Sequence, residues 1–401
     1  MPLRILFQTS EGKNMKPIKA PKNCTGCAAC SAVCARNAIS LCSDEDGFRY
    51  PQVDFSLCTE CGACASMCPV LNESSRSKAS KIYAVRTTDS SVRMSSSSGG
   101  FFSVLASKVI AEGGIVYGAA FSSDFKSVKH IGIEKAEDIG KLRGSKYVQC
   151  EDNANLFREI KKDLMSGRPV LFSGTPCQIE GLSAYLKKKY DNLLTVDMIC
   201  HGVPSPAVWS AYISELEEKN NAHSDKVSFR NKISGWKKYS FSVDFSNGNK
   251  YCQTVVDDPY MSAFVHSVTI RKSCFKCPFR KLERISDFTM ADFWGCEKVT
   301  PQMNDNTGIT LAFINSEKAI STFNSLCDIE FTEVSEDDAL RENSSMYIQT
   351  GYNLNRDYFF DNFNGTASIS ALLHDAANRH TLITRAIGKY RRIKQKIGDS
   401  K

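Results

Sequence analysis

Eight cysteines near the start of the chain follow one spacing twice, C-x2-C-x2-C-x3-C. The first copy consists of Cys24, Cys27, Cys30 and Cys34, and the second of Cys58, Cys61, Cys64 and Cys68, with Pro69 directly after it. A cubane cluster needs four converging thiolates, of which a tight C-x2-C-x2-C loop supplies three. The spacing therefore predicts two 4Fe–4S clusters, and with them the transfer of single electrons.

The fourth cysteine of each copy is expected to serve the other cluster, as in two-cluster arrangements of this spacing. One cluster is then held by Cys24, Cys27, Cys30 and Cys68, and the other by Cys34, Cys58, Cys61 and Cys64. A zinc site would show two CxxC pairs around a longer spacer, and a disulfide framework is typical of small secreted domains. Neither alternative matches two uninterrupted runs of four cysteines each. Residues 20–72 resemble the bacterial two-cluster ferredoxins.

A second set of cysteines lies far along the chain. Cys177 and Cys200 each follow a predicted strand, and Cys274 and Cys277 form a CxxC pair before Pro278. Functional groups gather at the carboxyl ends of parallel strands, so these four thiols are expected to converge and to hold a third cluster. Two alternatives stay open from the residues alone: buried core thiols and a structural zinc site. The other five cysteines are expected to be packing residues: Cys42, Cys150, Cys252, Cys296 and Cys327.

The elements that must position these thiols alternate between strands and helices. Strands are predicted at 81–87, 115–121, 168–174, 192–200 and 308–315, and helices at 101–112, 153–166, 176–189 and 206–219. The β-α-β-α order implies parallel strands with right-handed crossovers. A hairpin is predicted around Asn247-Gly248, and the part from 336 onward is expected to be mostly helical.

The fold class expected is α+β and α/β. A small ferredoxin-like two-cluster domain (20–72) precedes a larger α/β flavin domain with parallel strands and an added β-hairpin region (81–335). A disordered tail (1–19), a polar linker (73–80) and a helical C-terminal region (336–401) complete the expected organisation.

Composition limits the class of protein. The chain has 401 residues, 17 cysteines and a formal net charge of +7. So many cysteines without a secretory signal indicate a reducing compartment, hence a cytoplasmic protein. No run approaches the ~20 apolar residues of a membrane span. Anionic clusters offset the positive charge, so nucleic-acid binding does not follow from it.

The part from about 81 to 300 resembles the beta subunit of coenzyme F-420 hydrogenase/dehydrogenase. Six motifs in the same order carry the resemblance: Ser96 to Gly100, Arg143 to Gln149, Gly174 to Gln178, Cys200 to Pro204, Cys274 to Cys277 and Ser286 to Gly295. The resemblance implies FAD and a 4Fe–4S cluster, which favours Cys177, Cys200, Cys274 and Cys277 as its ligands. Ferredoxin-headed proteins of this kind are similar to products of polysaccharide gene clusters, so the coenzyme's name does not transfer by itself.

The resemblance also suggests where the flavin binds. The loop from Ser95 to Gly100 precedes a helix, and a pyrophosphate favours backbone N–H groups at a helix N-terminus; alone, such a loop is often a plain turn. The candidate flavin-binding residues are Ser96, Ser97, Ser98, Gly99, Gly100, Lys146, Thr175 and Asp292. Lys146 and His201 are the candidate catalytic residues. Each of three residues has a plainer alternative role. Lys146 would be a solvated surface lysine and Asp292 a turn-forming residue. For His201, local hydrogen bonding is the preferred interpretation.

The sequence thus predicts a flavin-dependent iron–sulfur oxidoreductase. Electrons pass between a ferredoxin-like protein, a reduced deazaflavin or a nicotinamide and an organic substrate through clusters and FAD. A non-catalytic electron-transfer subunit and a zinc-stabilised binding module are the rival classes. The basic amphipathic stretch 380–398 suits a membrane surface, although docking on protein is favoured.

Overall fold

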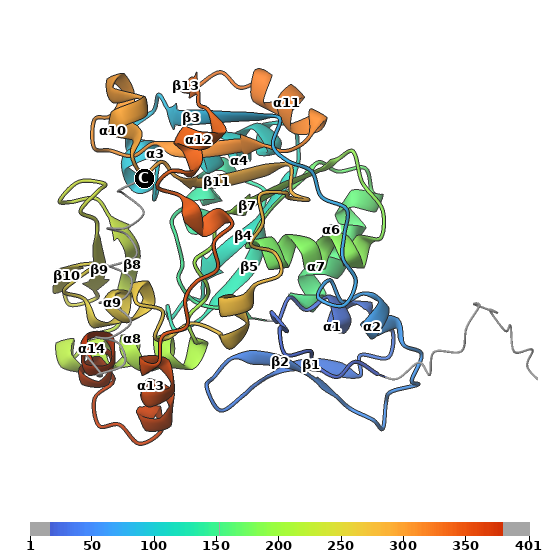
Figure 1. The fold of residues 1–401 in the computed structure, drawn as a ribbon, viewed down its shortest axis with the longest axis vertical. Helices are drawn as coiled ribbons and strands as arrows, with labels where there is room; N and C mark the ends of the chain where they lie inside the picture. Colours follow the sequence, from blue (N-terminus) through green and yellow to red (C-terminus); the bar gives the residue numbers. More distant parts are fainter. Residues whose placement is uncertain (1–16, 152, 380–401) are drawn as a thin grey trace, which may run out of the picture.

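The N-terminal part of the chain is a small head built on two short helices and a hairpin. The computed structural model describes residues 17–151 and 153–379, shown in Figure 1. The head comprises α1 (Ala29–Val33), β1 (Ile39–Ser43), β2 (Arg49–Val53) and α2 (Ala63–Ser66). β1 and β2 pair antiparallel, and the cysteine loops lead into α1 and α2. The stretch 380–398, with its predicted membrane or protein contact, lies outside the described residues, as does most of the predicted tail 1–19.

The body is organised by one large mixed sheet in the order β13-β3-β12-β11-β7-β6-β4-β5. Its strands are β3 (Lys81–Thr87), β4 (Ile115–Phe121), β5 (Val128–Ile133), β6 (Val170–Ser173), β7 (Leu193–Met198), β11 (Phe288–Asp292), β12 (Thr310–Ile314) and β13 (Ile329–Glu333). β4, β6, β7 and β11 run parallel to their neighbours in this group. The predicted parallel strands are therefore confirmed. The antiparallel strands at both edges make the whole sheet mixed.

Helices cover both faces of this sheet because alternate strand residues point to opposite sides. Val116 of β4 packs with α4 (Phe101–Ala111) and α11 (Glu317–Asn324). Tyr117 packs on the other face with the crossover helices α6 (Ala154–Met165) and α7 (Pro176–Leu186). The carboxyl ends of β6 and β7 thus meet at the start of α7, where the second cysteine set begins.

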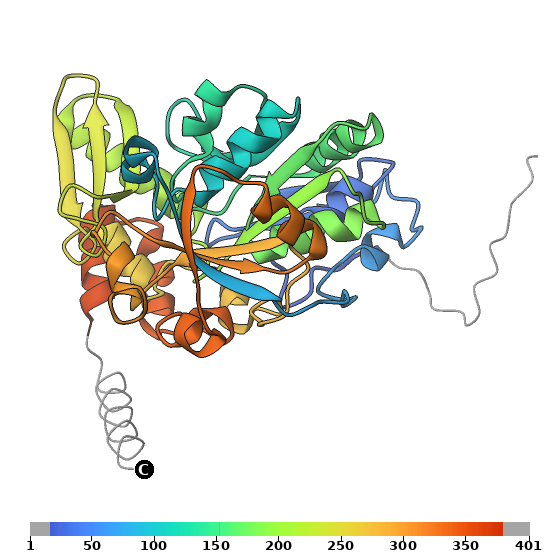
Figure 2. The same ribbon diagram turned by 90° about the horizontal axis from the view of Figure 1, so that it is seen from above.

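A separate three-stranded sheet and a group of helices form the other half of the body, visible in Figure 2. The strands β8 (Ser224–Asn231), β9 (Ser240–Phe245) and β10 (Lys250–Thr254) are antiparallel, and Gly248 has a φ of 87° in the predicted hairpin turn. They pack around Trp209 with the longer helices α8 (Pro206–Asn220), α9 (Pro259–Val265), α13 (Asn355–Phe363) and α14 (Ile369–Asn378).

Short elements complete the described fold. They are the α-helices α3 (Ser90–Ser95), α5 (Ile139–Leu142), α10 (Cys296–Val299) and α12 (Glu336–Leu340), and the 3₁₀ turns η1 (Ala136–Asp138), η2 (Lys272–Lys276), η3 (Pro301–Met303) and η4 (Ser344–Met346). Over the described residues, every helix is too short or too polar to cross a lipid bilayer.

The head is docked on the body at two places. Its α1 packs against α6 and α7, where Arg158 donates hydrogen bonds to the carbonyl oxygens of Ser31 and Ala32. Its hairpin brings Phe48 into the core around Trp209. In Figure 1 the head lies directly beneath α7, with the red C-terminal helices beside its hairpin.

Candidate functional site

The cysteines predicted to hold the first cluster, Cys24, Cys27, Cys30 and Cys68, are all buried in the head. Burial raises the pKa of Cys30 to about 12, and the neighbouring thiols Cys24 and Cys68 add to the rise. Burial likewise raises the pKa of Cys27, with Cys30, Cys177 and Cys24 adding to it. Thiols whose charges raise one another's pKa lie close together in the fold. The set of Cys24, Cys27, Cys30 and Cys68 therefore fits the ligands expected for one cluster.

Of the other four head cysteines, Cys64 is buried, Cys34 and Cys58 are partly buried and Cys61 is exposed. Backbone N–H groups point at three of their sulfurs, with N···Sγ distances of 3.3 Å from Ala38 to Cys34, 3.4 Å from Glu60 to Cys58 and 3.2 Å from Ile18 to Cys64. Hydrogen bonds to the sulfurs are one of the means by which a protein tunes a cluster. The set of Cys34, Cys58, Cys61 and Cys64 remains a prediction.

Cys177, Cys200, Cys274 and Cys277 lie on segments that the fold brings together, and their role as ligands of one cluster stays a prediction. β6 and β7 are adjacent parallel strands, so Cys177 at the start of α7 comes close to Cys200. Burial raises the pKa of Cys177 to about 12, and Cys277 and Cys200 add to the rise. Burial raises the pKa of Cys200 to about 12 as well, with Cys274 and Cys277 adding to it. Four partly buried, free thiols fit the donor set of a third cubane.

A single metal ion has a different requirement. Among the described residues, no three or more His, Cys, Asp and Glu side chains are arranged as a site for one ion. A cubane fills the space between its thiolates and so holds them farther apart than one zinc ion does. The choice between a cluster and zinc at these thiols stays a prediction.

The serine–glycine loop is largely bonded to the body itself. Ser96 donates to the Val92 carbonyl oxygen at 2.7 Å, and Ser98 to that of Ile309 at 2.6 Å. A Cβ on Gly99 would lie 2.4 Å from the Val85 carbonyl oxygen, so this position requires glycine. Gly100 precedes α4 with a φ of 85°. These positions hold the loop in place, and their predicted contact with a flavin stays a prediction.

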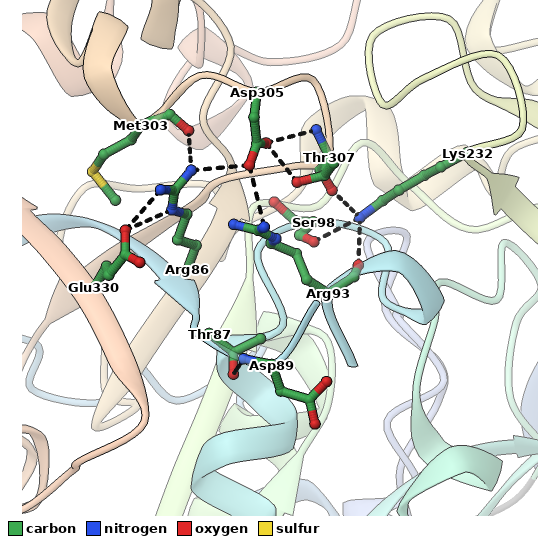
Figure 3. A network of polar contacts seen from close by, with 10 residues as sticks. All are labelled: Arg86, Thr87, Asp89, Arg93, Ser98, Lys232, Met303, Asp305, Thr307 and Glu330. Carbon is green, nitrogen blue, oxygen red and sulfur yellow. Dashed lines mark hydrogen bonds and ion pairs between the residues drawn. The ribbon is translucent and has the colours of Figure 1, made fainter. Parts of the chain in front are cut away.

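Figure 3 shows how the far side of this loop is anchored. The Lys232 ammonium donates to the carbonyl oxygens of Arg93, Ser98 and Thr307, with Nζ···O distances of 2.8, 2.8 and 2.5 Å. Asp305 forms ion pairs with Arg86 and Arg93 beside it, at 3.1 and 3.2 Å. The loop is therefore fixed before any ligand binds.

The near side of the loop borders a cavity of about 550 Å³. It lies between the loop, the segment 140–146 and the strand β8. Its lining includes five basic residues and three phenylalanines and no carboxylate: Lys141, Arg143, Lys146, Lys226, Arg230, Phe121, Phe125 and Phe229. Ser97 links two of its walls, because its hydroxyl accepts from the Ser145 backbone N–H at 2.8 Å.

The structure brings only part of the predicted flavin set to this cavity. Ser96, Ser97 and Lys146 line it, whereas Ser98, Gly99, Gly100, Thr175 and Asp292 are absent from its wall. The Lys146 ammonium donates to the carbonyl oxygens of Leu142, Arg143 and Gly144 at 3.0 to 3.2 Å. Burial lowers its pKa to about 8, partly opposed by Cys150.

Asp292 binds Arg230, a residue of the cavity wall. Its carboxylate accepts from Arg230 at 2.7 Å and from the Trp236 indole at 3.2 Å. Burial disfavours the charge of Arg230, but Asp292, Tyr147 and Tyr239 together outweigh this effect, so the pKa of Arg230 is raised. Tyr239 lies under the guanidinium at 3.8 Å from its ring centroid. Sequence reasoning missed Arg230 because β8 carries no motif.

Thr175 and His201 lie at the third thiol set. The Thr175 hydroxyl is 3.1 Å from the Cys177 sulfur and takes part in a capping box with Gln178 at the start of α7. His201 Nε2 is 2.9 Å from the Ser267 hydroxyl, and its ring meets Phe264 edge-on. Burial, and then Arg280, lowers the pKa of His201 to about 4. These contacts match the local hydrogen bonding preferred for His201.

The remaining cysteines divide into two kinds. Cys296 is fully buried in the core around Trp236, as expected of a packing residue. The same prediction is wrong for Cys252 and Cys327, which are exposed. Both lie in or next to edge strands of their sheets, where one side of the strand has no neighbour to cover a side chain.

The fold and the thiol sets define an iron–sulfur protein with a mixed α/β body. Residues 23–72 match the 4Fe-4S dicluster domain, and residues 167–339 match the family defined by the C terminus of the beta subunit of coenzyme F420 hydrogenase/dehydrogenase. The chain therefore carries a domain that matches the C-terminal part of that family behind a 4Fe-4S dicluster head. The predicted family is confirmed.

A solved structure of the F420-reducing [NiFe] hydrogenase complex from Methanosarcina barkeri is also similar to this chain. The likeness covers 76% of this chain and 91% of that chain, at 15% identity and a TM-score of 0.44. No curated protein matches the sequence.

Proposed function

We propose that this protein is an FAD-dependent iron–sulfur oxidoreductase that passes electrons between a redox partner and an organic acceptor. The observation that carries the proposal is the basic cavity beside the serine–glycine loop, in the same body as four converging thiols. The proposed domains are the head at 20–72, the linker at 73–80, the flavin and iron–sulfur body at 81–335 and the helical region from 336.

The cavity has the size and chemistry that a flavin nucleotide requires. Ligand sites are commonly about 300–1,000 Å³, and this cavity has about 550 Å³. Arg143, Lys226 and Arg230 would balance the charge of a pyrophosphate, and Phe121 and Phe229 offer apolar surface for the rings. Among the described residues, the wall carries basic side chains and no carboxylate, which favours an anionic ligand.

A continuous set of contacts joins the cavity to the third thiol set. Lys146 on the cavity wall influences the thiol of Cys150, and burial raises the pKa of Cys150 to about 11. The Gln178 side chain bonds to Cys150 and to the Thr175 backbone N–H, and the Thr175 hydroxyl faces the Cys177 sulfur. A flavin in the cavity would thus be separated from those thiols by Lys146, Cys150, Gln178 and Thr175.

The groups that bind here would divide the chemistry. Clusters carry single electrons, and a flavin exchanges one or two electrons. The protein residues hold these groups at fixed positions: the three thiol sets carry the clusters, and the cavity orients the flavin. We further propose that the acceptor is an organic molecule and that the reaction belongs to polysaccharide synthesis. We also propose a cytoplasmic location, because the 17 cysteines form no disulfide.

Anaerobic purification tests the proposal, with iron, sulfide, zinc and flavin assayed together. Three clusters predict about twelve iron atoms per chain, together with about one FAD. Substitution Cys177→Ser should remove about four iron atoms, whereas Cys252→Ser at an exposed position should remove none. A protein with zinc and without flavin would overturn the proposal.

A further inference from the structure

Arg271 is a buried cation at the junction of the head and the body. Its side chain is 0% exposed. Nε donates to the Cys24 carbonyl oxygen at 2.9 Å, and Nη1 donates to that of Arg49 at 2.9 Å. The ring of Tyr50 lies 3.8 Å from the guanidinium carbon. Two parts of the head, the Cys24 loop and the strand β2, thus meet one side chain of the body.

The backbone of the same residue is part of the third thiol set's loop. The Arg271 N–H donates to the Val203 carbonyl oxygen at 3.0 Å, and the Arg271 carbonyl oxygen accepts from the Cys274 N–H at 3.0 Å. Arg271 therefore begins the turn that presents Cys274, while its side chain holds the loop that presents Cys24.

The two thiol sets are close at this junction. The neighbouring charge of Cys177 contributes to the raised pKa of Cys27, after burial and Cys30. Arg271 acts in the opposite sense on the body's thiols: burial raises the pKa of both Cys177 and Cys274 to about 12, and Arg271 partly offsets this rise. The guanidinium is thus close to sulfurs of the third set and bonded to the backbone of the first.

Among residues 17–151 and 153–379, no carboxylate is in contact with the Arg271 guanidinium. Its hydrogen bonds go to carbonyl oxygens, to the Ser273 hydroxyl and to Gln149, and its Nη2 has no partner among the described residues. A half-buried carboxylate, Asp44, feels its charge without bonding to it. A buried cation is costly unless negative charge offsets it. Thiolates bound to clusters on either side would supply that charge.

We propose that Arg271 is the positioning residue of the junction: it fixes Cys24 against the turn of Cys274, and its charge stabilises the electron-rich state of the clusters on both sides. The proposal rests on the proposed function, because it requires clusters at both thiol sets. A cluster becomes more negative when it gains an electron, so a fixed cation in a medium of low dielectric constant favours that state and raises the reduction potential.

Two variants of Arg271 and a matched control test this role. Arg271→Met removes the charge, and Arg271→Lys keeps it with fewer hydrogen bonds. The control is Arg356→Met, since Arg356 is equally buried at the same junction. Arg356 donates to the Ile270 carbonyl oxygen and to the Asp46 carboxylate, both at 2.8 Å, so its charge is already paired. Each holoprotein is titrated anaerobically with electron paramagnetic resonance detection, and its iron content is measured.

The expected result is a lower potential for two of the three clusters in Arg271→Met, and wild-type potentials in both Arg271→Lys and Arg356→Met. Equal potentials in wild type and Arg271→Met would overturn the proposal, as would the same shift in Arg356→Met. If Arg271→Met loses iron, the Arg271→Lys variant becomes the test of the charge role. Wild-type potentials with full iron content in Arg271→Lys support that role, and lowered potentials with full iron content contradict it. Loss of iron from Arg271→Lys also contradicts it, because the charge is then present and insufficient. Failure of the flavin assay on the wild type would instead count against the proposed function.

Discussion

Gly181 of α7 lies directly against Cys27 of the head. A Cβ at Gly181 would be 2.9 Å from the Cys27 Cβ and 3.1 Å from its sulfur. Gly181 lies one turn beyond Cys177 on the same helix. The absence of a side chain therefore brings the first thiol set of the head next to the third thiol set.

Substitution Gly181→Ala should destabilise the protein by about 1–3 kcal/mol, because the added methyl group overpacks this contact. It should also loosen the head, so that the linker at 73–80 is cut faster by a protease. Chemical denaturation and limited proteolysis of the anaerobic protein measure the two effects. Gly140 is the control: it lies in α5 with nothing within 4 Å of an added Cβ, so Gly140→Ala should be neutral or slightly stabilising. Equal behaviour of the two variants would contradict the close contact.

Substitution Asp292→Asn should destabilise the body by about 3–5 kcal/mol, since it leaves the buried Arg230 without its counter-charge. The free energy of unfolding of the variant measures this. Glu333→Gln breaks the exposed pair with Lys81 and should change stability little. If Asp292→Asn were as mild as Glu333→Gln, the raised pKa of Arg230 would have another cause.

Substitution Arg143→Gln should weaken flavin binding roughly 10- to 100-fold, the range expected for losing a hydrogen bond to a charged group. Arg143 is oriented toward the loop by bonds to Ser95 and Ser103, at 2.8 and 3.0 Å. Rebinding of FAD to the flavin-stripped protein, followed by fluorescence, measures the affinity. The exposed Lys250 lies outside the cavity wall, and Lys250→Gln should retain wild-type affinity. A matching loss in both variants would indicate a general charge effect.

His130 should make the protein less stable in acid. Burial lowers its pKa to about 4, although its bonds to Ser173 and Asn153 oppose this. Between about pH 6.5 and 4 the unfolded chain binds a proton that the folded protein does not, so the free energy of unfolding falls as the pH falls through this window. Replacement His130→Gln removes this dependence. The stability difference between wild type and variant should be about 1 kcal/mol smaller at pH 5.5 than at pH 7.5, and an unchanged difference would contradict the lowered pKa.

The sequence predicted the elements whose pattern is local. The strand β3 and the helices α4 and α8 lie within a residue of their predicted ranges, because periodicity and glycine punctuation mark them. The sequence did not predict β5, β13 or the pairing of β12 with both β11 and β3. Those strands are short edge or antiparallel partners, and their positions depend on contacts distant in sequence.

The parts of the candidate site that a regular residue spacing marks were predictable from the sequence. Repeated cysteine spacing identified the head, and the strand ends identified Cys177 and Cys200. The cavity was only half found, since Lys226 and Arg230 belong to a strand with no motif and meet the serine–glycine loop only through folding. Arg271 was missed for the same reason: an isolated arginine shows its burial only in three dimensions.

The hairpin of the head has a consequence for how the protein is made. Phe48 packs 6.0 Å from Phe360, between ring centroids, and Asp46 accepts from Arg356. Domains fold in order from the N-terminus as the ribosome synthesises the chain. The head emerges first, yet its hairpin meets its final neighbours only after some three hundred further residues have been translated. During that interval the hairpin lacks Phe360 and Arg356, so the docking of the head is completed only when the C-terminal helices have been made.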